Sequence, residues 1–599
     1  IMPLTGGEPT RLTFGAGGTV VGWTGEGRVL YATGKHATLP NTQLVALDPK
    51  TKQRTRVPLS QASDGAYDAA GNLFFTRLDF QGSQTKRYQG GTAQNLWKLA
   101  PNAPEAVSLT ADFKGTSRSP MVWKERVYFL SDRDGVMNVW SMDSNGKSLK
   151  QVTHETGFDV QNPQMDNGKL IYQHGADIFV ADATTGASTK LAISLSSDFD
   201  QLRERWITKP MEWVTAAHLS PSGDKVVLTA RGQVFVVPTA HTGRLVEATR
   251  KPGVRYREAR FLPDGKGLVA LSDESGEVEL WKLPPTGEVN APREQLTKDG
   301  EVLRWDTTAS PDGKWIACRA DLSDVLAQLM GELSVLHTFV SGGDQRGGTD
   351  QIAVAGLGAE WERDEAKGGW RITRLWRTDP DLPEKLGPLL KPGVEASEGD
   401  VIAQLNGVPT LSVDDPAQLL CAQTGKQVRL RLYPGGDATK ARDVIVTAIS
   451  SGQEWDLRYS NWELARRQAV EKAGAGKLGY VHLRAMGDGD IAQWEREFYP
   501  VFNRDGLIID VRHNNGGNID SWILEKLVRK AWMFWKAPVG APTWNMQYAF
   551  RGKLVVLCDE NTASDGEAFA EGFKRLGLGK VIGTRTWGGE VWLTSSNTL

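Results

Sequence analysis

The first half of the chain alternates apolar and polar residues in short runs that are separated by turns. Each copy of the pattern joins two apolar strands through turns such as Pro-Ser-Gly, Pro-Asp-Gly or Asn-Gly. The clearest copies span residues 121–147, 164–186, 218–243 and 260–287. The turns that begin with proline recur roughly every 40–50 residues, the spacing of four-stranded propeller blades. We therefore predict β-propeller blades over residues 1–320, about six or more, in one or two propellers. A β-sandwich array is the alternative, but it would not repeat so regularly.

The apolar spacing changes from that of a strand to that of a helix at Asp321. This change predicts a helical segment over residues 321–350. One stripe of the segment carries Leu322, Val325, Leu326, Leu329, Leu333 and Leu336. His337 follows the stripe directly, and taken alone it would more often be a packed side chain than a catalytic one.

Residues 351–450 have the features of a small β domain with a compact helix. Gly356, Leu357 and Gly358 precede a strand, and residues 399–420 combine Gly-Asp-Val-Ile, a turn at Asn-Gly and a helical pattern. These features resemble a PDZ domain, which binds an extended peptide by strand addition and offers N–H groups of a glycine-rich loop to a terminal carboxylate. The resemblance implies peptide binding at Gly356–Gly358. A small β fold without a ligand is the alternative.

Residues 451–599 alternate between strand and helix patterns after a linking helix expected at 460–477. Such alternation predicts a mostly parallel sheet with helices on both faces. Ligands bind such sheets at the carboxyl ends of the strands. Two strand ends carry unusual residues, namely DVRHNNGGNID at 510–520 and DENTASDGEAF at 559–569.

Composition narrows the classes of function. The chain of 599 residues is long enough for three to five domains, and its net charge of −2 comes without a block of Lys or Arg. Nucleic acid and anionic membranes are therefore not expected partners, and no apolar run is long enough for a transmembrane helix. Cys318, Cys421 and Cys558 are too widely spaced for a disulfide framework or a metal site. No metal or organic cofactor is expected.

Ser564 and Asp565 begin a predicted helix, where free N–H groups and the positive end of the helix dipole point outward. A serine at this position is most commonly only an N-cap. However, Gly516 and Gly517 lie at the neighbouring strand end, and amides of a glycine loop and of a helix N-terminus together form an oxyanion hole. Ser564 is therefore a candidate nucleophile for acyl transfer. For the base, position in the glycine loop alone would select His513, with His482 in a strand as a further candidate.

The chain contains the segments GKLGYVHLRAM, GLIIDVRHNNGGN, TASDGEAF and RTWGG, and a helical pattern that ends in GELSVLHTFV. In these segments it resembles the tricorn-type branch of the tail-specific (S41) family of serine peptidases. It implies an N-terminal β-propeller, a PDZ-like domain and an α/β, ClpP/crotonase-like peptidase core over 451–599. It also implies that Ser564 is the nucleophile, that His337 is the base, and that the amides of Asp565, Gly516 and Gly517 form the oxyanion hole.

The resemblance implies a serine peptidase that hydrolyses oligopeptides and unfolded polypeptides. It further implies a homo-oligomer, expected to be a hexamer, in the cytoplasm, or an exported protein if a signal peptide precedes residue 1. The family has Ser where this chain has Leu336, and it uses a Glu that would lie beyond Leu599. We expect that segments before residue 1, near residue 320 and after residue 599 are missing.

Two other functions are alternatives to the peptidase. A prolyl-oligopeptidase-like hydrolase also joins a propeller to an α/β domain, but it requires a Gly-x-Ser-x-Gly turn that is not present around Ser564. A non-catalytic propeller–PDZ scaffold that binds peptides is the second alternative, and it rests on the departure at Leu336.

Overall fold

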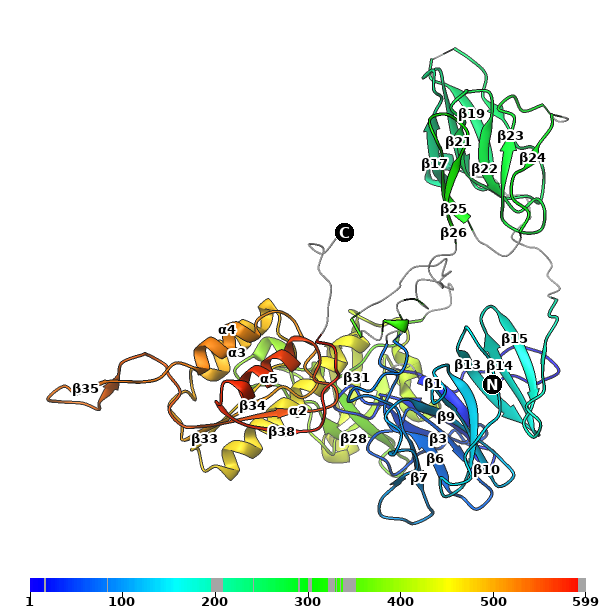
Figure 1. The fold of residues 1–599 in the computed structure, drawn as a ribbon. Coiled ribbons are helices and arrows are strands. Elements are labelled where there is room, and N and C mark those ends of the chain that lie inside the picture. The colour runs from blue at the N-terminus through cyan, green and yellow to red at the C-terminus, as the bar shows by residue number, and fades with distance from the viewer. Residues whose placement is uncertain are drawn as a thin grey trace. The chain divides into compact units, whose positions relative to one another are not determined.

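The structure, a computed structural model, describes residues 1–15, 18–82, 85–194, 208–240, 242–288, 291–299, 304–320, 329, 331–333, 336–337 and 352–590. The chain divides into two compact units. One contains Ile1–Leu191, Gly331–Thr338 and Gln345–Leu599, and the other contains Ala192–Met330 and Phe339–Asp344 (Figure 1).

The N-terminal part of the first unit consists of four antiparallel sheets of four strands each. Neighbouring strands along the chain pair with each other in every sheet, as in propeller blades. Alternate residues of the strands fill the space between the sheets, where Leu44, Phe74 and Phe129 are fully buried. The strands are β1 (Gly18–Trp23), β2 (Val29–Thr33), β3 (Gln43–Leu47), β4 (Arg54–Arg56), β5 (Asp64–Tyr67), β6 (Leu73–Thr76), β7 (Leu96–Leu99), β8 (Val107–Ser108), β9 (Ser117–Trp123), β10 (Arg126–Ser131), β11 (Asn138–Asp143), β12 (Lys150–Gln151), β13 (Val160–Asp166), β14 (Lys169–His174), β15 (Asp177–Asp182) and β16 (Ser188–Lys190).

The second unit continues the same pattern with two four-stranded sheets and one two-stranded sheet among its described residues. A short 3₁₀ helix, η2 (Pro210–Trp213), precedes them. The strands are β17 (Val214–Leu219), β18 (Lys225–Ala230), β19 (Gln233–Pro238), β20 (Val246–Glu247), β21 (Tyr256–Phe261), β22 (Leu268–Ser272), β23 (Glu279–Leu283), β24 (Glu294–Gln295), β25 (Arg304–Ala309) and β26 (Ile316–Ala320).

A six-stranded sheet with the strand order β27-β28-β29-β31-β32 follows, in which β30 pairs with β29. Its strands are β27 (Ala359–Asp364), β28 (Gly369–Leu375), β29 (Val401–Leu405), β30 (Val408–Pro409), β31 (Gln427–Tyr433) and β32 (Arg442–Thr447). The compact helix expected here is 3₁₀ rather than α, because Pro416 and the capping side chain of Asp415 begin a segment of only five residues. The 3₁₀ helices are η3 (Pro383–Lys385), η4 (Pro388–Leu390), η5 (Thr410–Ser412), η6 (Pro416–Leu420), η7 (Pro434–Gly436) and η8 (Ala438–Lys440).

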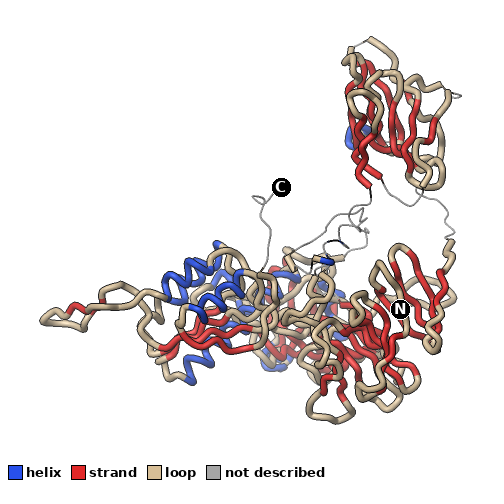
Figure 2. The backbone as a smooth tube through the Cα atoms, in the orientation of Figure 1, coloured by secondary structure: helices blue, strands red, loops and turns tan. Residues whose placement is uncertain are grey.

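The C-terminal core contains a parallel sheet, β33-β34-β37-β38, with helices packed around it (Figure 2). This arrangement confirms the predicted α/β alternation. The strands are β33 (Leu478–His482), β34 (Gly506–Asp510), β37 (Lys553–Cys558) and β38 (Gly579–Gly583), and a hairpin of β35 (Phe534–Trp535) and β36 (Thr543–Trp544) extends from the core. The helices are α2 (Ser451–Ala473), α3 (Asp488–Phe498), α4 (Asp520–Leu527) and α5 (Asp565–Arg575).

Alternation along β33 directs side chains to both faces of this sheet. Val481 packs with Trp494 of α3 and Phe569 of α5 in the main core. His482 points instead to α2, where Tyr459 hydrogen-bonds to it. Helices therefore cover both faces, as expected for a parallel sheet.

Two predicted helices differ from the structure or lie outside it. The linking helix begins at Ser451 rather than at residue 460, because Ser450 and Gln453 form a capping box. The helical segment predicted over 321–350 lies mostly outside the described residues. Of its apolar stripe, Leu336 is buried, whereas Leu329 and Leu333 are exposed. Within the described part of the chain, no helix is long and apolar enough to cross a membrane.

Candidate active site

Ser564 occupies the turn between β37 and α5 in a strained backbone conformation. Its φ of 51° and ψ of −127° lie where residues other than glycine are rarely found. Such strain costs about 1–3 kcal/mol and persists only where the surrounding structure enforces it. The N–H of Ser564 donates to the carboxylate of Glu567 (3.0 Å), so Glu567 caps this turn. Strained strand-to-helix turns of this kind expose a nucleophilic serine in α/β hydrolases.

Gly516 lies directly against Ser564. A Cβ atom on Gly516 would overlap the Ser564 side chain, and it would lie 2.9 Å from the hydroxyl oxygen. The backbone φ of 80° also favours glycine at this position. The structure therefore brings the two strand ends singled out from the sequence into contact, and glycine is what allows the approach.

The N–H groups around Ser564 differ in whether an acceptor already holds them. The N–H of Gly516 donates to Oδ1 of the buried Asn514 (2.9 Å). In contrast, Met486 and Gly517 form a parallel bridge, in which the N–H of Met486 donates to the carbonyl of Gly516 and the carbonyl of Met486 accepts the N–H of Asn518. The N–H of Gly517 itself therefore points away from Met486. Among the described residues, no acceptor takes the N–H of Gly517 or of Asp565. In the described part of the chain these two amides therefore have no acceptor, whereas that of Gly516 is already held.

The side chain of Asp565 ties the start of α5 to the start of α4. One carboxylate oxygen accepts hydrogen bonds from the N–H groups of Ile519 (2.8 Å) and Asp520 (3.0 Å). Burial, followed by the nearby charge of Asp520, raises the pKa of Asp565 to about 6. Because Ile519 follows the Gly516–Gly517 loop closely, this contact fixes the loop relative to the Ser564 turn.

Glu567 holds a second loop against the same turn. Its carboxylate accepts hydrogen bonds from the N–H groups of Gly588 (2.6 Å) and Gly589 (2.7 Å), in addition to that of Ser564. The side chain is 5% exposed. One buried carboxylate thus joins the RTWGG loop to the turn that carries Ser564. We did not single out Glu567 from the sequence, although Ser564 and Glu567 have the spacing of a capping box.

His337 lies against the same RTWGG loop. Its ring meets that of Trp587 edge to face, with ring centroids 5.2 Å apart. A Cβ atom on Gly589 would lie 2.9 Å from Cε1 of His337, so this glycine leaves room for the imidazole. The loop that His337 contacts is therefore the loop that Glu567 ties to Ser564, although 227 positions (564 − 337) separate the two residues in the sequence.

The first propeller sheets also contact this region. The hydroxyl of Tyr88 donates to the carbonyl of Trp587, and the N–H of Gly91 donates to the carbonyl of Thr586 (2.8 Å). Ion pairs from Lys86 (3.0 Å) and Arg87 (2.9 Å) to Glu332 hold the segment that precedes His337. Propeller loop, histidine segment and α/β core therefore meet at one place.

The other two candidate histidines occupy different surroundings. His513 is buried, its N–H donates to Asp559 (3.0 Å), and its ring lies 3.3 Å from the same carboxylate. Burial lowers the pKa of His513, although Asp559 opposes the shift. His513 thus fixes the loop between β34 and α4 to the end of β37.

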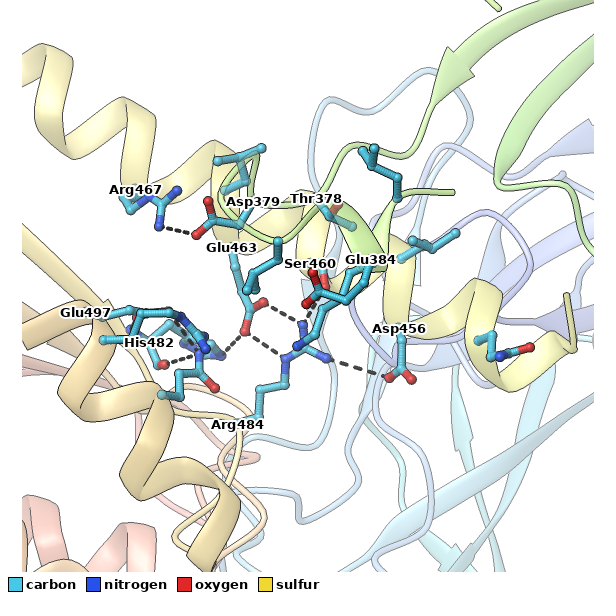
Figure 3. Close-up of a pocket in the computed structure, with 18 of the residues that line it drawn as sticks. Thr378, Asp379, Glu384, Asp456, Ser460, Glu463, Arg467, His482, Arg484 and Glu497 are labelled. Carbon is cyan, nitrogen blue, oxygen red and sulfur yellow. Dashed lines mark hydrogen bonds and ion pairs between the residues drawn. The ribbon is translucent and has the colours of Figure 1, made fainter. Parts of the chain in front are cut away.

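His482 lines a cavity of about 540 Å³ on the α2 side of β33 (Figure 3). Its Nε2 atom lies 3.0 Å from the hydroxyl of Tyr459, and burial lowers the pKa of His482. Nearby, Arg484 pairs with Glu463, and its guanidinium also reaches Ser460 (2.9 Å). These contacts give His482 a place in a buried polar network around α2.

The predicted peptide-binding loop at Gly356–Gly358 is engaged by its own chain. Gly356 exchanges hydrogen bonds with Ile449 (2.8 and 3.0 Å), and the side chain of Leu357 is buried. The N–H of Gly358 donates to the carboxylate of Glu454 on α2 (3.2 Å).

Among the described residues, no group of three or more His, Cys, Asp or Glu side chains could hold a metal ion.

Three family models match successive parts of the chain. Residues 477–599 match peptidase family S41, so the α/β core is an S41 peptidase domain. Residues 1–187 match the tricorn protease N-terminal beta propeller domain, and residues 355–451 match the tricorn protease PDZ domain. The chain is a homologue of the tricorn proteases, with a propeller, a PDZ domain and a peptidase domain in that order.

Individual relatives agree with these matches. Tricorn protease homolog 1 of Streptomyces coelicolor is 32% identical over 406 residues, which are 64% of this chain and 35% of that protein. The tricorn protease of Thermoplasma acidophilum is 29% identical over 282 residues, 47% of this chain and 26% of that protein. A crystal structure of the tricorn protease has the same fold, with a TM-score of 0.69 over 99% of this chain and 86% of that chain, at 17% identity. The chain spans about a third of the length of the Streptomyces relative, 35%.

Proposed function

We propose that the chain is a serine protease that hydrolyses peptide bonds in oligopeptides and unfolded polypeptides. Ser564 attacks the scissile carbonyl, and His337 accepts the hydroxyl proton and passes it to the leaving amine. The resulting acyl-enzyme is then hydrolysed by a water molecule that His337 deprotonates. The match of the core to a peptidase family favours this function over a non-catalytic propeller–PDZ scaffold.

The observation that carries the proposal is the strained turn at Ser564, held on two sides by glycine loops. Gly516 approaches the Ser564 side chain, and Glu567 ties the loop contacted by His337 to the backbone of Ser564. A backbone strain of this kind needs a reason beyond a simple helix cap. Presentation of a nucleophile between a base and amide donors is such a reason.

For the oxyanion hole we propose the N–H groups of Gly517 and Asp565. This narrows the set expected from the sequence, because Asn514 already accepts a hydrogen bond from Gly516. Gly516 serves instead to let the loop approach Ser564. Two donors at a preorganised position are typically worth about 10²–10³ each in kcat.

Three further features stay predictions of the family resemblance. They are a carboxylate from beyond Leu599 that orients His337, a homo-oligomer with six subunits, and a cytoplasmic location, or export if a signal peptide precedes residue 1. Leu336 is buried and has no hydroxyl, so it cannot supply the orienting hydrogen bond itself.

Replacement of the nucleophile tests the proposal. Ser564→Ala is expected to lower kcat on a fluorogenic peptide by roughly 10⁴–10⁶ without a change in circular dichroism. Ser521→Ala, at an exposed position in the first turn of α4, is the matched control and should keep full activity. Substantial hydrolysis by purified Ser564→Ala would rule out this residue as the nucleophile.

A further inference from the structure

A groove lies between the PDZ domain, the first propeller sheets and α2. The cavity of about 630 Å³ is lined by Gly356 and Leu357 of the glycine loop, by strand β27 and by η6, with propeller residues on the opposite side. In the described residues, β27 pairs with β28 alone, so its other edge is open. An open strand beside a glycine loop is the arrangement with which an extended peptide pairs by strand addition.

Glu454 fills the end of this groove at the glycine loop, where the terminal carboxylate of a peptide was expected. Its Oε1 atom accepts the N–H of Gly358 (3.2 Å), and a Cβ atom on Gly356 would lie only 2.5 Å from the carboxylate carbon. The carboxylate therefore lies on the backbone of the glycine loop, with no room between them for another group. Arg458, one helical turn later, contacts the same carboxylate (3.3 Å).

Glu454 lies among several cations of the groove. Lys35 and Arg54 of the propeller both pair with the buried Asp415, at 3.6 Å and 2.8 Å. Burial, followed by the positive charges of Lys35, Arg56, Arg458 and Arg54, lowers the pKa of His36 to about 4. The facing acidic groups are Glu454, Asp415, Glu360, Glu362 and Asp414. Removal of the charge of Glu454 would therefore leave Arg458 without its carboxylate partner beside the glycine loop.

We propose that Glu454 is an internal substitute for a ligand carboxylate and sets the specificity of the groove. With Glu454 in place, the groove binds an extended peptide segment along β27, and a free C-terminal carboxylate on the peptide does not increase the affinity. This specificity is the reverse of the one expected from the Gly356-Leu357-Gly358 motif. It does not depend on the peptidase activity proposed above.

The physical reason is competition for the same donors and charges. A peptide carboxylate at the loop would have to displace Glu454 from Gly358 and from Arg458, and two carboxylates close together repel each other. A hydrogen bond to a charged group is worth more than one between neutral groups. Loss of the Glu454 charge therefore converts a repulsive place into one that attracts a free C-terminus.

The test compares two pools of fluorescein-labelled octapeptides by fluorescence anisotropy. Both pools are degenerate at the first seven positions and end in Leu, one as the free acid and the other as the amide. The full chain with Ser564→Ala is used throughout, so that no peptide is cleaved and the result is independent of catalysis. We expect the Glu454 form to bind both pools with dissociation constants within about threefold.

Glu454→Gln and Glu454→Ala should each acquire a preference for the free acid, of about tenfold for the Ala variant. The Gln variant keeps the shape of the side chain and therefore carries the test if the Ala variant fails to fold. Asp456→Ala, at an exposed position on the same helix, is the control and should bind like the parent. The proposal would be overturned if the parent preferred the free acid tenfold, or if neither pool bound to the parent. It would also be overturned if a folded Glu454 variant showed no preference.

Discussion

Glycine loops meet carboxylates of neighbouring helices at two places in the first unit, the Ser564 turn and the PDZ domain, and the two places differ in which amides those carboxylates hold. Beside Ser564, Glu567 accepts from Ser564, Gly588 and Gly589, and the amide of Gly517 has no acceptor among the described residues. In the PDZ domain, Glu454 accepts from the loop amide of Gly358 itself.

This difference shows that a glycine-rich loop near a helix is not by itself a binding site. The carboxylates beside Ser564 are structural clamps that leave the amide of Gly517 without an acceptor among the described residues. The carboxylate of Glu454 instead occupies the loop amide of Gly358. Backbone N–H groups must therefore be accounted for one by one before a loop is assigned a ligand.

The largest effect is expected from loss of the proposed base. His337→Ala should lower kcat on a fluorogenic peptide by roughly 10⁴–10⁶, and its combination with Ser564→Ala should be no worse than either change alone, because such residues act as a unit. Steady-state kinetics of the single and double variants measure this.

His513→Ala and His482→Ala are the comparison variants. We expect them to change stability or binding, because the buried His513 and His482 make polar contacts with Asp559 and Tyr459 rather than with the RTWGG loop. An inactive His513→Ala beside an active His337→Ala would show that the glycine loop, and not the helical segment, supplies the base.

Addition of a methyl group at Gly516 should lower kcat by about 10². In Gly516→Ala the new Cβ overlaps the side chain of Ser564, and displacement of a catalytic group by about 1 Å has an effect of this size. Gly425→Ala is the control, because Gly425 also has a positive φ of 74° but has open space around it. If both variants keep similar kcat, the close approach of Gly516 has no role in positioning Ser564.

Glu567→Gln, which removes the charge of this side chain, should lower kcat by about 10–10² with a smaller change in KM. A Gln side chain offers one acceptor oxygen, whereas the two oxygens of Glu567 accept three N–H groups. Glu571→Gln, with its exposed carboxylate on the same helix, is the control. A variant with unchanged kcat and a much higher KM would place Glu567 in substrate binding rather than in positioning.

The smallest effect concerns pH. The pKa of Asp565 is raised to about 6, above about 3.9 in an unfolded chain, so the stabilising protonated form is lost as pH rises through about 4–6. Hydrogen-exchange protection of the segment 515–530, corrected for intrinsic rates, should fall over this range. In Asp565→Asn the protection should stay level, and an equal fall in both proteins would assign the pH dependence to other groups.

The sequence predicted the elements of the site better than their contacts. The apolar run of β37 followed by the helical pattern of α5 located Ser564 at a strand end, and the parallel sheet brings Gly516 beside it. These features follow from periodicities within short segments.

Contacts between distant segments could not be predicted in this way. Glu454 and Gly358 are 96 positions apart, and nothing in the local pattern of α2 marks Glu454 as the residue that meets the loop. Similarly, only the family resemblance selected His337, because its position depends on packing against Trp587. Such contacts are set by tertiary packing, which periodicity does not encode.

We propose that the strained turn at Ser564 presents a nucleophile. Labelling of the full chain with a fluorophosphonate, followed by mass spectrometry of proteolytic peptides, tests it most directly, because the reagent bonds covalently to an activated serine. We predict one modified residue, Ser564, and a much slower reaction in His337→Ala. Modification of a different serine, or a folded chain that remains unlabelled, would contradict it.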